Sequence, residues 1–119
     1  MAPDDAFHAD DVDVAPDWVR ERCEAGDIQL IDVREPYEWE TGRLAGARHI
    51  ELEQVASQAA TIDREKPVVF YCRVGARSGM AADAFRRAGY DAYSMDGGLA
   101  AWQEQGLPLE PPGGDVADH

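Results

Sequence analysis

Short apolar runs alternate along the chain with segments of helical periodicity. The two strongest runs lie at residues 28–33 and 67–71, and each is mostly apolar and has the length of a strand. Such runs are typical of strands buried on both faces of a parallel sheet. Weaker strands are expected at residues 11–14, 48–50 and 91–95.

Helices are expected between these strands. Pro16 is placed to open a first helix that Gly26 ends, and apolar residues recur at helical intervals from Ser78 until Gly89 ends the second. Shorter helices are expected at residues 36–40, 53–60 and 99–105. This alternation predicts an α/β fold with a parallel sheet.

The chain of 119 residues has the length of one domain. We expect the domain at residues 11–109, between an acidic, disordered N-terminal tail at 1–10 and a disordered, Pro- and Gly-rich tail at 110–119. No apolar run is long enough to cross a bilayer, and the acidic start is unlike a secretory signal. The expected location is therefore the cytoplasm, with no membrane partner.

The chain is strongly acidic, with 24 acids against 11 bases and a net charge of −13. This balance argues against a partner that is a nucleic acid. It favours a surface selected for solubility, with an acidic surface made for a basic partner as the alternative. Two of the bases, Arg73 and Arg77, lie close to Cys72 in the sequence. They predict a local positive charge that can attract a small anionic substrate.

Two cysteines, Cys23 and Cys72, do not form a disulfide framework. No paired spacing of cysteines or histidines suggests zinc, so no metal site is expected. Cys23 is expected to be inert on the first helix, with a resolving disulfide to Cys72 as the alternative.

Cys72 follows a predicted strand directly, and a loop that contains Gly75 connects it to a helix. Ligands of open α/β sheets bind beyond the carboxyl ends of strands. Backbone N–H groups at a helix N-terminus stabilise an anion, so we expect Cys72 to be a thiolate nucleophile. The alternative is a buried structural cysteine, but two nearby arginines serve no packing purpose around one.

Four segments of the sequence occur in a characteristic order. They are Ile31-Asp32-Val33-Arg34-Glu35, Gly42-Arg43-Leu44-Ala45-Gly46-Ala47, Cys72-Arg73-Val74-Gly75-Ala76-Arg77-Ser78 and Gly97-Gly98-Leu99-Ala100-Ala101-Trp102. In order and spacing they resemble the rhodanese homology domain across residues 11–109. The resemblance implies a five-stranded parallel sheet with helices on both faces, and a catalytic cysteine that carries sulfur as a persulfide.

The loop length separates two branches of these relatives. Four residues lie between Cys72 and Arg77, as in sulfur-transferring members, whereas the related phosphatases and arsenate reductases have five. The resemblance thus implies a thiosulfate sulfurtransferase that passes sulfur from Cys72 to cyanide or a thiol, a protein thiol included, without a cofactor. The donor would be held by the active-site loop, whose members after Cys72 are Arg73, Val74, Gly75, Ala76, Arg77 and Ser78.

Other residues are expected to support this loop. Asp32 and Arg34 end a strand near the same sheet edge, and a structural pair is favoured over a catalytic acid. Trp102 is expected to anchor the last helix rather than to wall the site. Ser78 is expected to cap the helix after the loop and to touch the sulfur.

Three other functions compete with the enzyme. A persulfide carrier that delivers sulfur to one protein partner needs the same cysteine and loop. A regulatory domain without catalysis usually lacks the cysteine, which is present here. A phosphatase is disfavoured by the loop length.

Overall fold

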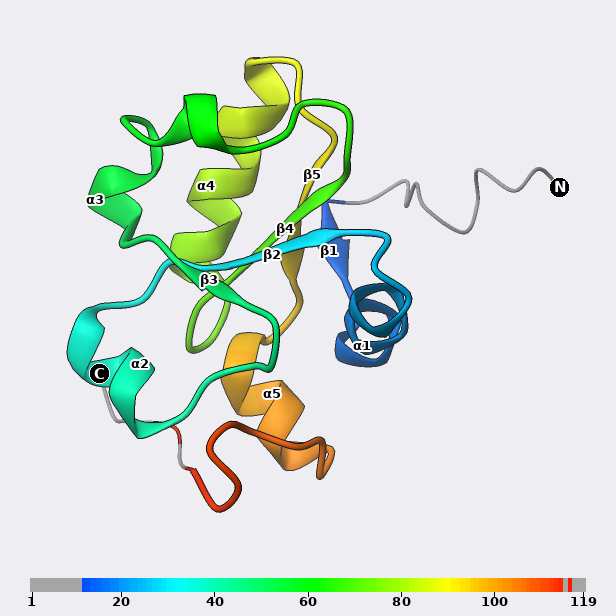
Figure 1. The fold of residues 1–119 in the computed structure, drawn as a ribbon, viewed down its shortest axis with the longest axis vertical. Helices are drawn as coiled ribbons and strands as arrows, with labels where there is room; N and C mark the ends of the chain where they lie inside the picture. Colours follow the sequence, from blue (N-terminus) through cyan, green and yellow to red (C-terminus); the bar gives the residue numbers. More distant parts are fainter. Residues whose placement is uncertain (1–11, 115, 117–119) are drawn as a thin grey trace, which may run out of the picture.

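Five strands form one sheet in the order β1-β5-β4-β2-β3 (Figure 1), and every neighbouring pair is parallel. This computed structural model describes residues 12–114 and 116, so the predicted tail at 1–10 lies outside the described residues. The strands are β1 Asp13–Val14, β2 Gln29–Asp32, β3 Arg48–His49, β4 Val68–Tyr71 and β5 Ala92–Met95. The predicted parallel α/β sheet is confirmed.

The helices follow the predicted alternation, except at residues 53–60. They are α1 Pro16–Glu24, α2 Pro36–Thr41, α3 Leu52–Val55, α4 Ala76–Arg87 and α5 Gly98–Glu104. The helix expected at 53–60 is instead the short α3 followed by a 3-10 turn, η2 Ala59–Thr61. Ser57 and Thr61 each donate a hydroxyl hydrogen bond to the carbonyl oxygen three residues earlier, which competes with a continuous helix.

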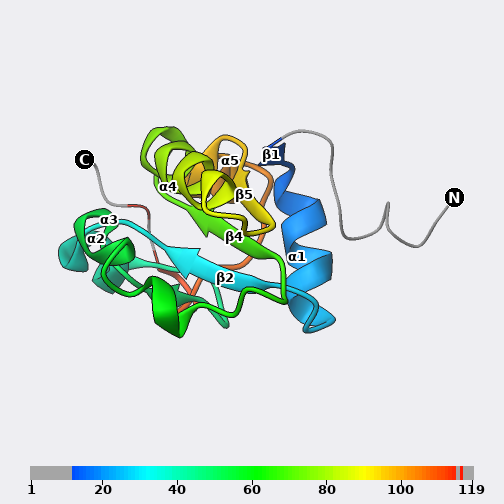
Figure 2. The same ribbon diagram turned by 90° about the horizontal axis from the view of Figure 1, so that it is seen from above.

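Helices cover both faces of the sheet, as the family resemblance implied. On one face α3 and α4 contribute Val55 and Phe85 to a core with Phe70, and Figure 1 shows these two helices side by side. On the other face α1 and α5 contribute Val19 and Trp102 to a second core. In Figure 2, α2 and α3 lie together on the left of the molecule and α1 lies on the right. No helix of the described residues is long and apolar enough to span a membrane.

The chain reverses its direction across the sheet between β2 and β4. From β2 it continues outward to β3, whereas from β4 it continues to β5 on the other side. Segments that leave the carboxyl ends of two such strands diverge and leave a crevice between them, the usual ligand position in this fold class. The chain after β4 begins with Cys72, and the chain after β2 contains Arg34 and Glu35.

A buried ion pair fixes the turn after β2. Asp32 and Arg34 are both fully buried, and the Arg34 guanidinium donates to the Asp32 carboxylate at 2.7–3.0 Å and to the Gly42 carbonyl at 2.7 Å. The Asp32 carboxylate also accepts the backbone N–H of Arg34 at 2.9 Å. Removing one member of such a pair leaves a buried charge without compensation.

The C-terminal segment differs from its prediction as a disordered tail at 110–119. Glu110 and Arg43 exchange two backbone hydrogen bonds of 2.7 and 2.9 Å, and Val116 packs against the core that contains Trp102. The Pro and Gly content of this segment favoured a disordered tail. Its backbone partner, Arg43, is distant in sequence, so no local pattern predicted the packing. Residues 115 and 117–119 lie outside the described residues.

The buried pair generates a prediction about stability. Asp32→Ala should lower the free energy of unfolding by about 3–5 kcal/mol, because Arg34 loses its carboxylate while remaining buried. Asp83→Ala removes an exposed partner of Arg87 at 3.5 Å and should cost no more than about 1 kcal/mol. Urea unfolding of both variants measures the difference, and equal losses would contradict the role given to Asp32.

Candidate active site

Cys72 is enclosed by the turn that links β4 to α4. The residue has 0% exposure, and the backbone N–H of Gly75 donates to its Sγ at 3.0 Å. Gly75 occupies the N-cap position of α4 with φ 110°, a left-handed conformation that glycine adopts without strain. This turn aims the first N–H groups of α4 at the sulfur, which is the arrangement expected of an anion site.

Ser78 contacts the sulfur but does not cap the helix. Helix α4 begins at Ala76, two residues before Ser78, and Gly75 provides the N-cap without a side-chain hydrogen bond. The predicted capping role of Ser78 is therefore wrong, because the glycine turn starts the helix earlier than the apolar periodicity indicated. The Ser78 hydroxyl lies 3.5 Å from the Cys72 Sγ and 2.7 Å from the Ser94 hydroxyl on β5.

The surroundings of Cys72 favour its thiolate form. Burial raises the pKa of this thiol, but hydrogen bonds from the Ser78 hydroxyl and from the backbone N–H groups of Ser78, Gly75 and Val74 outweigh burial and lower the pKa below its ordinary value. Cys23 behaves in the opposite way, because burial and the neighbouring Glu24 raise its pKa. Of the two thiols, Cys72 therefore has the greater tendency to ionise near neutral pH.

The first turn of α5 holds the active-site loop from the side opposite α4. The N–H of Leu99 donates to the Cys72 carbonyl at 2.8 Å, and the N–H of Ala100 donates to the Arg73 carbonyl at 2.9 Å. Gly98 has φ +61°, and a Cβ there would lie 2.5 Å from the Arg73 carbonyl oxygen. The Gly97-Gly98 pair, part of the fourth family-like segment of the sequence, therefore allows two backbones to meet at the cysteine.

Arg77 has a buried partner that sequence reasoning missed. Its guanidinium donates to both carboxylate oxygens of Glu38, at 2.8 and 3.1 Å, and Glu38 is fully buried. The hydrogen bonds to Glu38 raise the pKa of Arg77 against the effect of burial. Glu38 lies in the first turn of α2 and also accepts the N–H of Glu35 at 3.0 Å. Nothing in the sequence around Glu38 predicts that its side chain is buried.

The other residues that the sequence singled out lie at the end of β2 or in the core on one face of the sheet. Asp32 and Arg34 form the pair described above at the end of β2, beside the loop after β4. Trp102 lies in the core that α1 and α5 share, and its indole N–H donates to the Pro108 carbonyl at 2.9 Å. Cys23 packs against this same core, whereas Cys72 belongs to the core on the other face. A disulfide between them, the alternative considered for Cys23, would require the two thiols to meet across the sheet.

Metal binding has no support among the side chains that the structure describes. No cluster of three or more His, Cys, Asp or Glu residues with the geometry of a metal site occurs there.

The comparisons with known proteins match this geometry. The family model of the rhodanese-like domain matches residues 15–105, which include β2, β4, the active-site loop and α5. The chain belongs to the rhodanese-like domain family. Several of its relatives are named sulfurtransferases, and another is named a transcriptional regulator.

Two curated relatives and one solved structure illustrate the family. The rhodanese-like domain described here is 38% identical to the thiosulfate sulfurtransferase GlpE of Pseudomonas aeruginosa over 91 residues, 76% of this chain and 82% of that protein. It is 45% identical over 75 residues to YqhL of Bacillus subtilis, an uncharacterised protein, and this match spans 62% of the chain and 60% of YqhL. A rhodanese-related protein of Thermoplasma volcanium superposes with a TM-score of 0.76 at 25% identity, covering 82% of this chain and 95% of that one.

The contact between Ser78 and Cys72 predicts a shift in acidity. Ser78→Ala removes a donor to the thiolate, so the pKa of Cys72 should rise and the thiolate fraction near neutral pH should fall. The ultraviolet absorbance of the thiolate, titrated with pH and corrected with Cys72→Ala, measures this pKa. Ser57→Ala, an exposed serine on the segment after α3, is the control. If Ser78→Ala leaves the titration curve of Cys72 unchanged, the role given to the Ser78 hydroxyl in lowering this pKa is contradicted.

Gly98 predicts a second, steric effect. Gly98→Ala should destabilise the rhodanese-like domain by more than the roughly 1–2 kcal/mol of a left-handed backbone alone, because its Cβ meets the Arg73 carbonyl. Gly26→Ala is a matched control, since Gly26 has φ +77° and nothing lies within 4 Å of a Cβ there. Thermal unfolding compares the two variants, and an equal loss in both would remove the steric role of Gly98.

Proposed function

We propose that this rhodanese-like domain is a sulfurtransferase that moves a sulfane sulfur from a donor such as thiosulfate to a thiophilic acceptor through a persulfide on Cys72. The observation that carries the proposal is the Gly75 N–H, 3.0 Å from the Cys72 Sγ at the N-terminus of α4. An anion at this position is stabilised both by directed N–H groups and by the helix dipole.

The first step loads the enzyme. The Cys72 thiolate attacks the outer sulfur of thiosulfate, a new S–S bond forms, and the S–S bond of thiosulfate breaks as sulfite leaves with the electron pair. The product is a persulfide anion on Cys72. The N–H groups of the loop members from Arg73 to Ser78 are the donors that would hold its negative charge.

The second step unloads the enzyme. An acceptor such as cyanide attacks the outer sulfur of the persulfide, thiocyanate leaves, and the Cys72 thiolate is regenerated. The two products leave in separate half-reactions, so the steady-state kinetics should be ping-pong. Neither half-reaction needs a cofactor.

The loop arginines would contribute charge to these steps. Arg73 and Arg77 flank the backbone donors, and guanidinium groups bind oxyanions well. Because Arg77 is bonded to Glu38 on both carboxylate oxygens, a thiosulfate dianion must compete with this carboxylate for its guanidinium.

Counting released sulfite tests the proposed first step. Without an acceptor, the parent protein should release one sulfite per chain from thiosulfate and then stop, and adding cyanide should restart the release. Cys72→Ala should release none, because it lacks the nucleophile. Cys23→Ala should behave as the parent does, since Cys23 lies on the other face of the sheet. Sulfite release by Cys72→Ala equal to the parent's would contradict the proposal.

A further inference from the structure

A hollow of about 220 Å³ lies beside the active-site loop, and half of the residues that line it are acids. We call it the acidic recess, and its lining residues are Val33, Glu35, Glu51, Leu52, Glu53 and Arg77. Three of the six are glutamates. The cation, Arg77, already forms its ion pair with the buried Glu38. The recess therefore presents an excess of negative charge next to the loop that carries Cys72.

The sheet topology brings these carboxylates to the cysteine. Glu35 follows β2 and Glu51 follows β3, so both lie beyond the carboxyl ends of parallel strands, as Cys72 does after β4. The backbone holds this arrangement, because the N–H of Leu52 donates to the Val33 carbonyl at 3.1 Å. The acids belong to the rim of the active-site edge and are not scattered over the surface.

Exposed apolar side chains lie on the elements around the same loop. Among the described residues the large hydrophobic side chains that are most exposed are Tyr37, Val74 and Met80, at 49%, 53% and 64%. Val74 belongs to the loop, and Met80 follows Arg77 by one helical turn on α4. Tyr37 precedes Glu38, the partner of Arg77. Exposed apolar groups gathered around a site are typical of surfaces that contact another protein.

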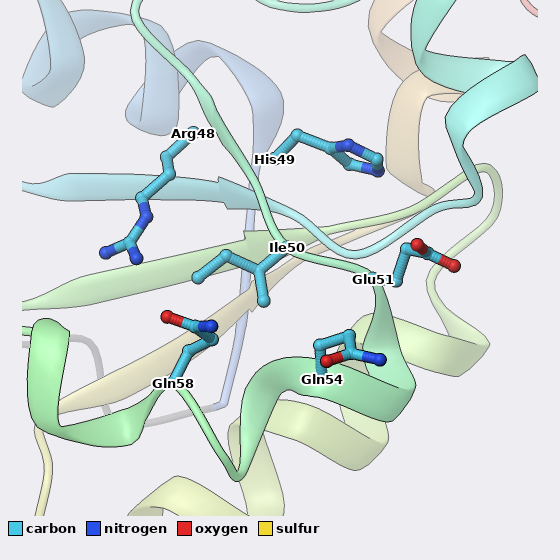
Figure 3. Close-up of a pocket in the computed structure, with 6 residues that line it drawn as sticks. All are labelled: Arg48, His49, Ile50, Glu51, Gln54 and Gln58. Carbon is cyan, nitrogen blue, oxygen red and sulfur yellow. The ribbon is translucent and has the colours of Figure 1, made fainter.

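A second hollow extends this surface away from the cysteine. It measures about 290 Å³, shares Glu51 with the acidic recess, and is lined by Arg48, His49, Ile50, Glu51, Gln54 and Gln58. Figure 3 shows Glu51 and Gln54 at one end of this hollow and Arg48 and Gln58 at the other. Thiosulfate or cyanide would fill only a small part of these two adjoining hollows, whereas a polypeptide segment would occupy both.

We propose that the face formed by the acidic recess and by Tyr37, Val74 and Met80 docks a protein acceptor whose cysteine is flanked by Lys or Arg and by apolar residues. This inference rests on the proposed function and names the class of its acceptor. Charge complementarity carries it, because three glutamates face the docking position and the net charge of the chain is −13. Such a field speeds the approach of a basic partner and slows that of an anion.

The transfer on this face balances as a thiol exchange. The acceptor thiolate attacks the outer sulfur of the Cys72 persulfide, an S–S bond forms on the acceptor, and the bond to the Cys72 sulfur breaks. The electron pair of the broken bond returns to Cys72 as its thiolate. The acceptor leaves as a persulfide, and no external oxidant or reductant takes part.

Matched peptides test the charge preference. The protein is first loaded with thiosulfate, and one added sulfur atom is verified by intact mass. It then reacts with a peptide that contains one cysteine between lysines with an adjacent leucine, or with the same peptide carrying glutamates in place of the lysines. Each rate is divided by that peptide's rate with a low-molecular-weight disulfide, which corrects for the acidity of its thiol. The lysine peptide should react about tenfold faster at low ionic strength, and salt should reduce this advantage.

Variants locate the effect on the proposed face. The double variant Glu51→Gln, Glu53→Gln should lose most of the lysine preference, and it should load faster with thiosulfate because the anion is repelled less. Glu21→Gln, an exposed acid on α1 across the sheet, should keep the preference. Met80→Gln should slow the lysine peptide through lost apolar contact while leaving the rate of thiosulfate loading unchanged.

The outcomes separate this inference from the proposed function. If the parent takes up no sulfur from thiosulfate, the proposed function fails and the docking inference fails with it. If it loads but reacts with both peptides at equal corrected rates, or if the double variant keeps the preference, only the docking inference is overturned. If cysteamine, a small cationic thiol, reacts as fast as the lysine peptide, the acceptor is a small cation and the protein partner is excluded.

Discussion

The backbone of the active-site loop is held between two helices, and the chemistry of Cys72 depends on this constraint. From one side α4 aims its first N–H groups at the sulfur, and from the other side α5 donates to the carbonyls of Cys72 and Arg73. The loop can approach α5 this closely because residue 98 has no side chain. Fixed donors stabilise an anion without any reorganisation when the charge develops. The same geometry suits a thiolate and the persulfide proposed to replace it.

The charges around the loop serve two different purposes. Directly at the sulfur, neutral N–H and hydroxyl groups stabilise the negative charge. At the rim, the acidic recess presents carboxylates, and a free anion must compete with Glu38 for the guanidinium of Arg77. An acceptor that carries its own positive charge would gain from this rim, whereas a small dianion would gain only from the loop. The chain thus favours anionic sulfur at one point within a surface suited to a cationic partner.

Local patterns predicted the elements and the place of Cys72, because a buried parallel strand and the loop after it leave a signal within a few residues. The helix boundaries that were predicted wrongly are set by individual local contacts. The glycine turn moved the start of α4 ahead of Ser78, and side-chain hydrogen bonds divided the segment after α3. Glu38 and Glu110 escaped notice for another reason: their partners, Arg77 and Arg43, are distant in sequence. Pairings of this kind arise only when the sheet brings loops together, so no spacing within the chain reveals them.

Peptide mapping by mass spectrometry shows whether Cys72 carries the transferred sulfur, as we propose. After exposure to thiosulfate and digestion without reductant, the peptide that contains Cys72 should gain the mass of one sulfur atom, and the peptide that contains Cys23 should not. Treatment with cyanide should remove the added mass. Sulfur found on Cys23, or found equally on both peptides, would contradict the proposed role of Cys72.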